Sequence, residues 1–269
     1  MKRILLRWMV MPIRMRSAFS YLTQRAGLVL RWLFTSREHT NFTYHLSKLN
    51  QRYLANFLGV VCNQPVSVME AYMREVVEDK ALREHLTQHT RAGERNFLAD
   101  DEPRYARRIG WYAIVRATRP SVVIETGVDK GLGSCVLAAA LKRNAAEGYP
   151  GRYYGTDINP KAGYLLQAPY DQHGEIIYGD SIESLKKISR PIDLFINDSD
   201  HSMEYEMHEF ETIADKLSPD AIILGDNSHF SDKLINFAER TNRQFLFFQE
   251  QPEGHWYPGG GIGAAYPTR

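Results

Sequence analysis

Two apolar segments of this chain each end in acidic residues, and they constrain the fold more than any other feature. The first, 192–197, runs into Asp198-Ser199-Asp200-His201, and the second, 221–225, runs into Asp226-Asn227. One helix-length segment, Met203 to Leu217, separates them. This order of strand, helix and strand predicts two parallel strands in one sheet, so both acidic ends lie at the same edge. Open α/β sheets bind their ligands at that edge.

Carboxylates gathered at one edge repel one another, and a divalent cation held by oxygen ligands is the usual way to relieve that repulsion. A zinc site or a disulfide framework has no support, because the two cysteines, Cys62 and Cys135, lack CxxC spacing. Lone cysteines agree with a reducing cytoplasm. The formal net charge of +1 gives the chain no general attraction to nucleic acid.

Alternating strand and helix signals surround the two acidic segments and predict the fold class. Short β-branched or aromatic runs alternate with helix-length apolar patterns from residue 105 onward. The expected fold is a doubly wound, Rossmann-like α/β sheet of about seven strands that ends in an antiparallel hairpin. The further strands are predicted at 122–125, 152–156, 175–178, 244–248 and 262–266, and further helices at 105–118, 134–143 and 231–240.

The chain before this domain is predicted to be a helical extension. We assign residues 1–103 to the extension and residues 104–269 to the α/β domain. Within the extension, Ser67 has the position of a helix N-cap. Residues 1–37 are basic and amphipathic, and no Asp or Glu occurs before Glu38. Up to Ser36 the basic residues are Lys2, Arg3, Arg7, Arg14, Arg16, Arg25 and Arg31.

Three interpretations of the basic segment stay open. It packs on its own domain or on a second subunit of a homo-oligomer, it lies on an anionic membrane surface, or it acts in targeting. No apolar run in it approaches the roughly 18–20 residues that span a bilayer. We expect a cytoplasmic protein, with peripheral contact to the inner face of the membrane through residues 1–37 as an open alternative.

A loop containing glycine follows the strand predicted at 122–125. It reads Glu125-Thr126-Gly127-Val128-Asp129-Lys130-Gly131-Leu132-Gly133, which is not the GxGxxG fingerprint of dinucleotide sites. Glycine in such a loop lets the backbone approach a ligand closely. Asp157 and Gly179-Asp180-Ser181 end the next two strands. A carboxylate such as Asp157 can accept hydrogen bonds from ribose hydroxyls.

This succession of strand ends resembles the class I S-adenosylmethionine-dependent methyltransferases, over about residues 105–269. The resemblance implies S-adenosylmethionine as the cofactor. Each residue also has a simpler interpretation, since the glycines suit plain turns and the aspartates suit turn or helix caps. The resemblance assigns Glu125, Thr126, Gly127 and Gly131 to the methionine part, Asp157 to the ribose, Asp180 and Ser181 to the adenine, and Asp198 to the same cofactor site.

The acidic sequences D-x-D-H and D-N resemble the metal-dependent branch of this family. That branch includes sugar O-methyltransferases such as macrocin O-methyltransferase, and the cephalosporin-hydroxylase-like proteins. The resemblance implies that Asp198 and Asp226 are ligands of Mg²⁺. The next position is commonly Asp in the branch and is Asn227 here, whose amide oxygen can coordinate but carries no charge. Asn227 is therefore the third predicted ligand and the point of departure from the pattern.

Methyl transfer to a hydroxyl requires that the pKa of the hydroxyl be lowered, which a divalent cation does, and that a base remove the proton. His201 and Asp200 are the candidate catalytic bases. His201 is favoured because its pKa lies nearer neutrality, with a purely orienting or capping role as the alternative. Further residues expected near the ligands are His255 and Trp256 beside the acceptor, and Arg107 and Trp111 beside the methionine end.

The leading hypothesis is a Mg²⁺-dependent O-methyltransferase that acts on a hydroxyl of a sugar or glycosylated metabolite, with a lipid-linked acceptor as a narrower version. The expected partner is a small-molecule or glycan acceptor and not a nucleic acid. One alternative reads Asp198-Ser199-Asp200 as the DxD motif of a nucleotide-sugar glycosyltransferase, which leaves the glycine loop unexplained. A second alternative is a methyltransferase-like fold without catalysis, kept as a membrane or assembly partner, which Asn227 alone favours.

Overall fold

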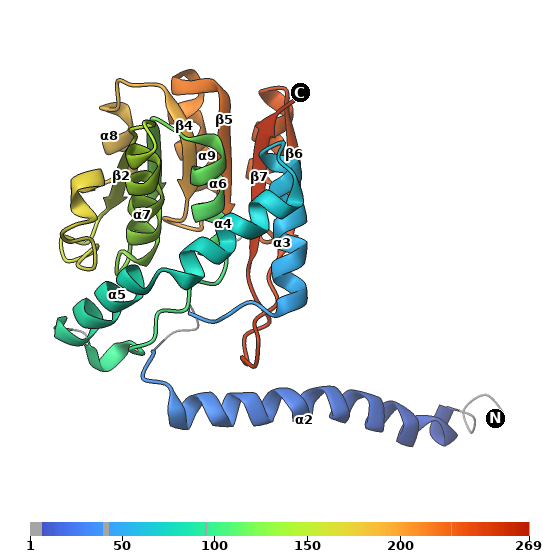
Figure 1. Cartoon of the computed structure of the whole chain (residues 1–269). Helices are drawn as coiled ribbons and strands as arrows, with labels where there is room; N and C mark the ends of the chain where they lie inside the picture. Colours follow the sequence, from blue (N-terminus) through green and yellow to red (C-terminus); the bar gives the residue numbers. More distant parts are fainter. Residues whose placement is uncertain (1–6, 40–42, 95, 227, 269) are drawn as a thin grey trace.

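The structure contains one sheet of seven strands. It is a computed structural model that describes residues 7–39, 43–94, 96–226 and 228–268. The strands are Val122–Thr126 (β1), Arg152–Asp157 (β2), Gly174–Tyr178 (β3), Ile192–Asn197 (β4), Leu217–Asp226 (β5), Arg243–Gln249 (β6) and Gly261–Pro267 (β7). They lie in the order β3-β2-β1-β4-β5-β7-β6 (Figure 1).

Strands β1 to β5 are parallel, and β7 pairs antiparallel with both β5 and β6. The predicted doubly wound sheet with a C-terminal hairpin is therefore confirmed. The register pairs Asn197 with Gly225, so Asp198 and Asp226 follow two strands that end level with each other. The prediction that the two acidic ends meet at one edge is confirmed as well.

Both faces of the sheet are buried, as near-continuous apolar strands require. Side chains alternate along each strand between two apolar clusters. Val123, Leu194 and Ile222 belong to one cluster, whereas Ile124 and Phe195 belong to the other.

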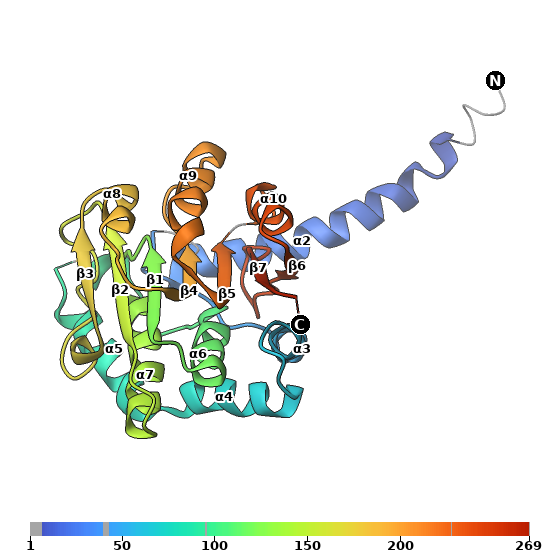
Figure 2. The ribbon, with the colours of Figure 1, turned by 90° about the horizontal axis from the view of Figure 1, so that it is seen from above.

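Helices cover both faces of the sheet (Figure 2). One face carries Arg108–Thr118 (α6) and Leu132–Ala146 (α7), and the other carries Ser181–Lys186 (α8), Met203–Ile213 (α9) and Lys233–Arg240 (α10). The helices Lys48–Val61 (α3), Val66–Glu78 (α4) and Lys80–Ala92 (α5) lie on the side of α6 and α7. Leu54, Met69 and Leu82 from these three helices belong to the same apolar cluster as β1 and α6. Residues 48–92 thus share a core with the sheet.

The helix Met11–Thr35 (α2) stands apart from this body (Figures 1 and 2). Among the described helices, α2 included, none combines the length and apolar character that crossing a bilayer requires. Most side chains of α2 are exposed, and the helix meets its own domain near its C-terminal end, where Trp32 packs against Trp256.

Two local predictions are wrong. The N-cap of α4 is Pro65 and not Ser67: the ring of Pro65 holds its φ at −56°, and the helix begins at the next residue, Val66. The helix predicted to reach Leu217 ends at Ile213, and one 3₁₀ turn at Ala214–Lys216 leads into β5. Ser218-Pro219-Asp220 belongs to β5, at an irregular part of its pairing with β4, where Pro219 is exposed and needs no ladder bond.

Glu125, the residue before the last of β1, is buried inside the protein. Its carboxylate accepts hydrogen bonds from the hydroxyls of Tyr153 and Ser134. Burial raises the pKa of Glu125 from an ordinary 4.5 to about 7, although the Tyr153 hydrogen bond and the charge of Arg108 act in the opposite direction. The folded state therefore holds a proton here that the unfolded chain has already lost near neutral pH.

Replacing Glu125 by Gln should remove a loss of folding stability that grows as the pH rises. Between pH 4.5 and about 7 the unfolded carboxyl ionises first, so the wild type loses stability as pH rises, by at most about 3 kcal/mol. Denaturant unfolding should show that the stability of Glu125→Gln relative to the wild type is higher at pH 8 than at pH 5. An equal difference between the two proteins at both pH values would contradict the raised pKa.

Candidate functional site

A pocket of about 650 Å³ opens at the carboxyl edge of the parallel strands. Its wall comes from the ends of β1, β2, β4 and β5, from the segment before α8 and from the start of α6. Segments far apart in the sequence thus meet where the strand order predicted them to meet. Nine residues predicted at or near the site lie in this wall: Arg107, Gly127, Asp157, Asp180, Ser181, Asp198, Asp200, His201 and Asp226.

Gly127 brings the glycine loop into contact with the end of β4. Its φ is 83°, and a Cβ at this position would lie 1.9 Å from the carbonyl oxygen of Asp198. The Gly127 amide donates to the carbonyl of Thr156 at 2.9 Å. Glycine is required here because the loop must pass directly over the strand end that carries the acidic residues.

Asp157 at the end of β2 holds the glycine loop in place. One oxygen accepts the amides of Val128 and Asp129 at 3.0 Å each, and the other accepts the amide of Asn159 at 2.8 Å. An ionised carboxylate offers about four acceptor positions, so one is left for a ligand hydroxyl. Asp157 is therefore both a turn residue and part of the pocket wall.

Asp180 caps α8 and also faces the pocket. Its carboxylate accepts the Glu183 amide and the Tyr205 hydroxyl, each at 3.0 Å. The amide bond is the main reason that the pKa of Asp180 is lowered, so this carboxylate is ionised at neutral pH. The Ser181 hydroxyl lies 2.9 Å from that of Tyr205 and donates to the buried Glu209.

Three residues of the predicted cofactor set lie beneath the pocket wall. Glu125 is bonded to Tyr153, as described above, and the Thr126 hydroxyl donates to Glu209 at 2.8 Å. Gly131, with a φ of 92°, is the N-cap of α7. These residues shape the loop from below, and their side chains do not form part of the described pocket wall.

Arg107, at the start of α6, is the cation that the acidic strand ends contact. Its Nη2 lies 2.7 Å from Asp226 and 3.4 Å from Asp198, and its Nη1 lies 3.6 Å from the fully buried Glu250. Burial opposes the charge of Arg107, but the three carboxylates outweigh burial and raise the pKa of its guanidinium above the ordinary value. The guanidinium lies over the ring of Trp111, which is buried below it.

Arg107 does not cancel the repulsion between the two aspartates. Burial, followed by the charge of Asp226, raises the pKa of Asp198 well above its ordinary range. His201 lies beside the pair: one possible ligand atom from each of Asp198, His201 and Asp226 falls within 4.8 Å of the others. Two carboxylates and an imidazole converging in this way can hold a divalent cation.

Asp200 stands outside this cluster of described residues. The exposed Asp200 turns back and accepts the Ser202 amide at 2.8 Å, ahead of α9. Asn227 lies outside the residues that the structure describes, so its prediction as a ligand stays a prediction. Asp200 therefore stabilises the turn before α9, whereas His201 lies beside the acidic pair.

Several wall residues escaped the sequence analysis. Tyr44, before α3, donates to Glu250 at 2.8 Å and lines the pocket together with Tyr257. Arg108 also lines the pocket, and its Nε and Nη1 are buried without a hydrogen-bond partner among the described residues. His255 and Trp256, predicted to border the acceptor, are not in the described wall: Trp256 instead packs edge-on against Trp32 with ring centroids 5.4 Å apart.

No sequence pattern predicts Tyr44 or Glu250 as site residues, because both reach the site only through tertiary packing. Arg108 had one signal that could have been used. Two adjacent arginines at the start of a helix oppose the helix dipole, which favours anions at that end. Such a pair indicates that anionic groups meet the helix there.

Alanine at Gly127 should be far more costly than alanine at Gly148. Both glycines have positive φ, 83° and 91°, but a Cβ at Gly148 meets nothing within 4 Å. Gly148→Ala should cost about 1–2 kcal/mol of backbone strain. Gly127→Ala should cost about 1–3 kcal/mol more, because the end of β4 must move. Denaturant unfolding measures both, and equal losses would contradict the close contact with Asp198.

Comparisons with known proteins agree with this geometry. Residues 124–228 match a family model described as a methyltransferase domain. TomG, an O-methyltransferase from Streptomyces achromogenes involved in tomaymycin synthesis and solved with S-adenosylmethionine, is 18% identical with a TM-score of 0.50, over 71% of this chain and 91% of TomG. PaMTH1, a Podospora anserina methyltransferase solved with S-adenosylhomocysteine, is 15% identical with a TM-score of 0.50, over 71% of this chain and 88% of PaMTH1.

No curated protein matches this chain. At these identities the two solved structures establish a common fold, and the family model adds a sequence similarity over residues 124–228. The matched residues, 124–228, begin in β1 and extend just beyond β5, so they contain the glycine loop, Asp157, Asp180 and both acidic strand ends. Residues 124–228 are therefore similar to a methyltransferase domain, and the chain shares its fold with solved methyltransferases.

Proposed function

We propose that this protein is an O-methyltransferase that transfers the methyl group of S-adenosylmethionine to a hydroxyl of a sugar or glycosylated metabolite, with a divalent cation such as Mg²⁺ at the acidic cluster. One observation carries the proposal. The glycine loop and Asp157, which suit the cofactor, and the acidic pair with His201, which suits a hydroxyl acceptor, form the wall of one pocket.

The described residues fit the cofactor. Asp157 retains an acceptor position for a ribose hydroxyl, and Asp180 and Ser181 provide polar groups further along the wall. Arg108 has two buried donor nitrogens without a partner among the described residues. A carboxylate such as that of the methionine part would satisfy them, since a buried unpaired donor costs about 1–3 kcal/mol.

The acidic cluster also fits a divalent cation. Three carboxylates contact the guanidinium of Arg107, and two of them, Asp198 and Asp226, also repel each other. Asp198 and Asp226 would hold the cation, and His201 would stand beside it as the base. A cation bound there would lower the pKa of an acceptor hydroxyl. Arg107 contacts both aspartates, so it would share them with the cation.

The chain's own groups then have separate tasks. Asp198 and Asp226 attract and orient the polar end of the acceptor, and Arg107 keeps the two carboxylates together. His201 receives the hydroxyl proton, because it lies beside the pair while Asp200 is engaged with the Ser202 amide. Tyr257 borders the same wall and offers an aromatic surface to the apolar face of a sugar.

The two alternatives from the sequence explain less. A DxD glycosyltransferase site needs Asp198 and Asp200 to act together, whereas Asp200 points to the Ser202 amide and is not part of the converging cluster of described residues. A non-catalytic role rested on Asn227, about which the structure says nothing. We therefore retain methyl transfer as the proposal.

Titration calorimetry should show S-adenosylmethionine binding and no comparable binding of UDP-sugars. Asp157→Ala should weaken cofactor affinity about 10–100-fold, because a charged acceptor is lost. Asp193→Ala is the matched control: Asp193 also accepts two backbone amides, of Ser121 and Val122, but at the opposite edge of the sheet. Tighter binding of UDP-sugars, or equal losses in both variants, would refute the proposed cofactor site.

Turnover of sugar acceptors should depend on Mg²⁺ and on the acidic pair. Asp198→Asn should abolish stimulation by Mg²⁺ while the cofactor affinity changes only a few-fold. His201→Ala should lower kcat by about 10²–10⁴. His208→Ala, an exposed histidine on α9, is the control and should leave kcat unchanged. A loss below tenfold in His201→Ala would assign the base to Asp200, which Asp200→Asn then tests.

A further inference from the structure

The surface of α2 is the most hydrophobic exposed part of the described chain. Ten large hydrophobic side chains are exposed between Trp8 and Phe34, against eleven in all the rest of the described residues. Phe34 is 85% exposed and Ile13 is 66% exposed. Exposed apolar surface gathered in this way marks an interaction site.

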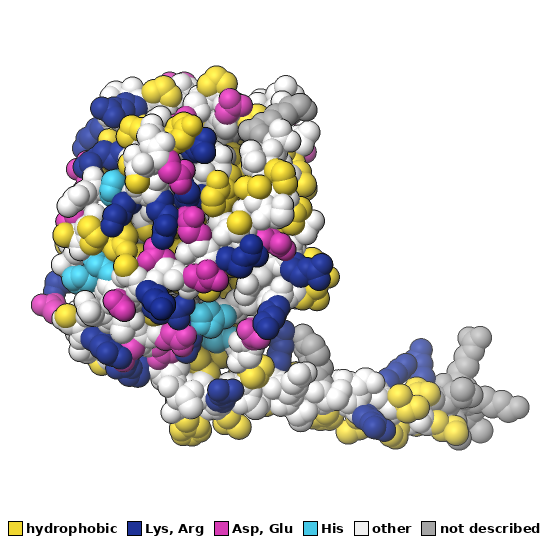
Figure 3. All heavy atoms as spheres, viewed as in Figure 1, with side chains coloured by type: hydrophobic (Ala, Val, Ile, Leu, Met, Phe, Trp, Pro, Cys, Tyr) yellow, Lys and Arg dark blue, Asp and Glu magenta, His cyan; other side chains and the backbone are white. Residues whose placement is uncertain are grey.

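Part of this apolar surface forms a continuous stripe along the helix. Met15, Phe19, Leu22, Ala26, Val29 and Leu33 follow one another at alternating spacings of four and three residues, which places them on one face of a helix. Figure 3 shows hydrophobic side chains gathered along the edge of α2 that faces away from the body. The stripe is therefore not directed at the sheet or at its covering helices.

The charges around the stripe identify what covers it. At about 100° per residue, Arg14 and Arg25 flank the stripe on one side and Arg16 flanks it on the other. No acidic residue occurs before Glu38. A second copy of α2 packed on this stripe would bring arginines together with no acid on either helix to pair them, whereas an anionic lipid surface pairs with all of them.

The amphipathic pattern indicates a helix that lies in a membrane surface. None of the described helices has the length and apolar character to cross a bilayer. Arginines that flank an apolar stripe can bury their carbon chains at its margin while the guanidinium groups reach the lipid headgroups. This arrangement suits the boundary between headgroups and acyl chains.

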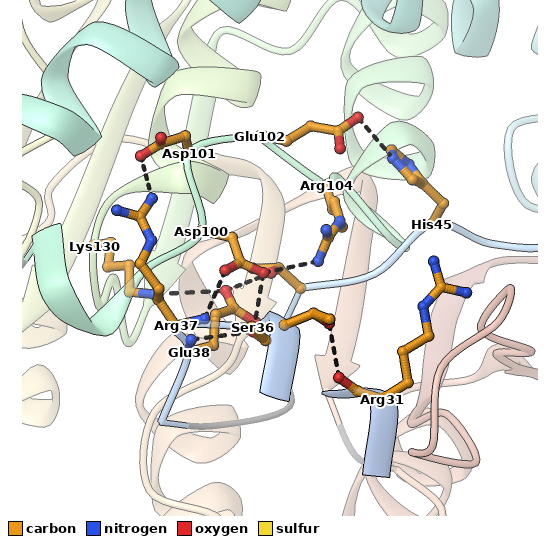
Figure 4. A network of polar contacts seen from close by, with 12 residues as sticks. Arg31, Ser36, Arg37, Glu38, His45, Asp100, Asp101, Glu102, Arg104 and Lys130 are labelled. Carbon is orange, nitrogen blue, oxygen red and sulfur yellow. Dashed lines mark hydrogen bonds and ion pairs between the residues drawn. The ribbon is translucent and has the colours of Figure 1, made fainter. Parts of the chain in front are cut away.

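The base of α2 is fixed to loops at the pocket edge (Figure 4). Ser36 donates to Asp100 at 2.9 Å, Arg37 pairs with Asp101, and Glu38 lies 3.9 Å from Lys130 of the glycine loop. Trp32 packs against Trp256, next to the wall residue Tyr257. In Figure 1, α2 runs beneath the edge of the sheet at which β5 ends.

We propose that α2 docks this protein on an anionic lipid bilayer, with the stripe of Met15, Phe19, Leu22, Ala26, Val29 and Leu33 buried among the acyl chains and the arginines on the headgroups. Because the base of α2 is tied to the pocket edge, docking turns that edge toward the bilayer. The inference rests on α2 alone and does not require the proposed methyl transfer.

Flotation of the purified full-length protein with vesicles tests this proposal. Vesicles of phosphatidylcholine with phosphatidylglycerol should bind the protein at least tenfold better than vesicles of phosphatidylcholine alone, and high salt should weaken the binding. The double variant Phe19→Glu, Leu22→Glu should lose at least tenfold in binding. The matched variant Ser20→Glu, Gln24→Glu adds the same charge on the opposite, exposed face and should stay within about threefold of the wild type.

Unchanged thermal unfolding of both variants would show that the fold is intact, as expected for exposed positions. Analytical ultracentrifugation supplies the opposing outcome. If the wild type sediments as a dimer and Phe19→Glu, Leu22→Glu as a monomer, a second copy covers the stripe and the proposal is wrong. Equal binding to neutral and anionic vesicles, or equal losses in the two variants, would also overturn it.

Discussion

The ion cluster around Arg107 is the interaction on which the arrangement of this site depends. Its guanidinium contacts Asp198 after β4, Asp226 at the end of β5 and Glu250 after β6, and its own amide donates to Glu250 at 3.1 Å. A buried charge is tolerated only when it is paired, and removing one partner typically costs about 3–5 kcal/mol. The cluster therefore fixes the start of α6 against three strand ends. Helices α3 and α4 in turn pack on α6.

The same cluster explains how one edge can serve two ligands. Arg107 draws the acidic ends of β4 and β5 together, while Gly127 lets the loop after β1 pass directly over Asp198. The cofactor loop and the acidic pair are neighbours for this reason. A cofactor held along the loop and an acceptor held at the acids would thus meet without a large rearrangement of the backbone.

Much of this arrangement could be predicted from the sequence. Strand periodicity gave the sheet, and the rule that parallel strands share one carboxyl edge brought Asp157, Asp180, Asp198 and Asp226 to one pocket. The dual roles of Asp157 and Asp180, as caps and as wall residues, combine interpretations that were weighed as alternatives. The functional side chains at each strand end are adjacent in the sequence, so the local sequence is enough to identify them.

What could not be predicted depends on contacts between distant segments. Glu250 and Tyr44 reach Arg107 only through the folded chain, and the sequence suggested a metal where an arginine already contacts both acids. The buried Glu125 has its hydrogen-bond partner, Tyr153, on the neighbouring strand, so this contact too was not visible in the local sequence. The exposure of α2 could not be predicted either, because an amphipathic pattern does not identify the surface that its apolar face contacts.

The central claim is that the pocket binds S-adenosylmethionine beside a divalent cation. A crystal structure of the full chain with S-adenosylhomocysteine and Mg²⁺ tests it most directly. We expect the ribose on Asp157, the homocysteine part along Gly127, and Mg²⁺ on Asp198 and Asp226. Arg107 alone between those aspartates at saturating Mg²⁺, with no cofactor along the glycine loop, would contradict it.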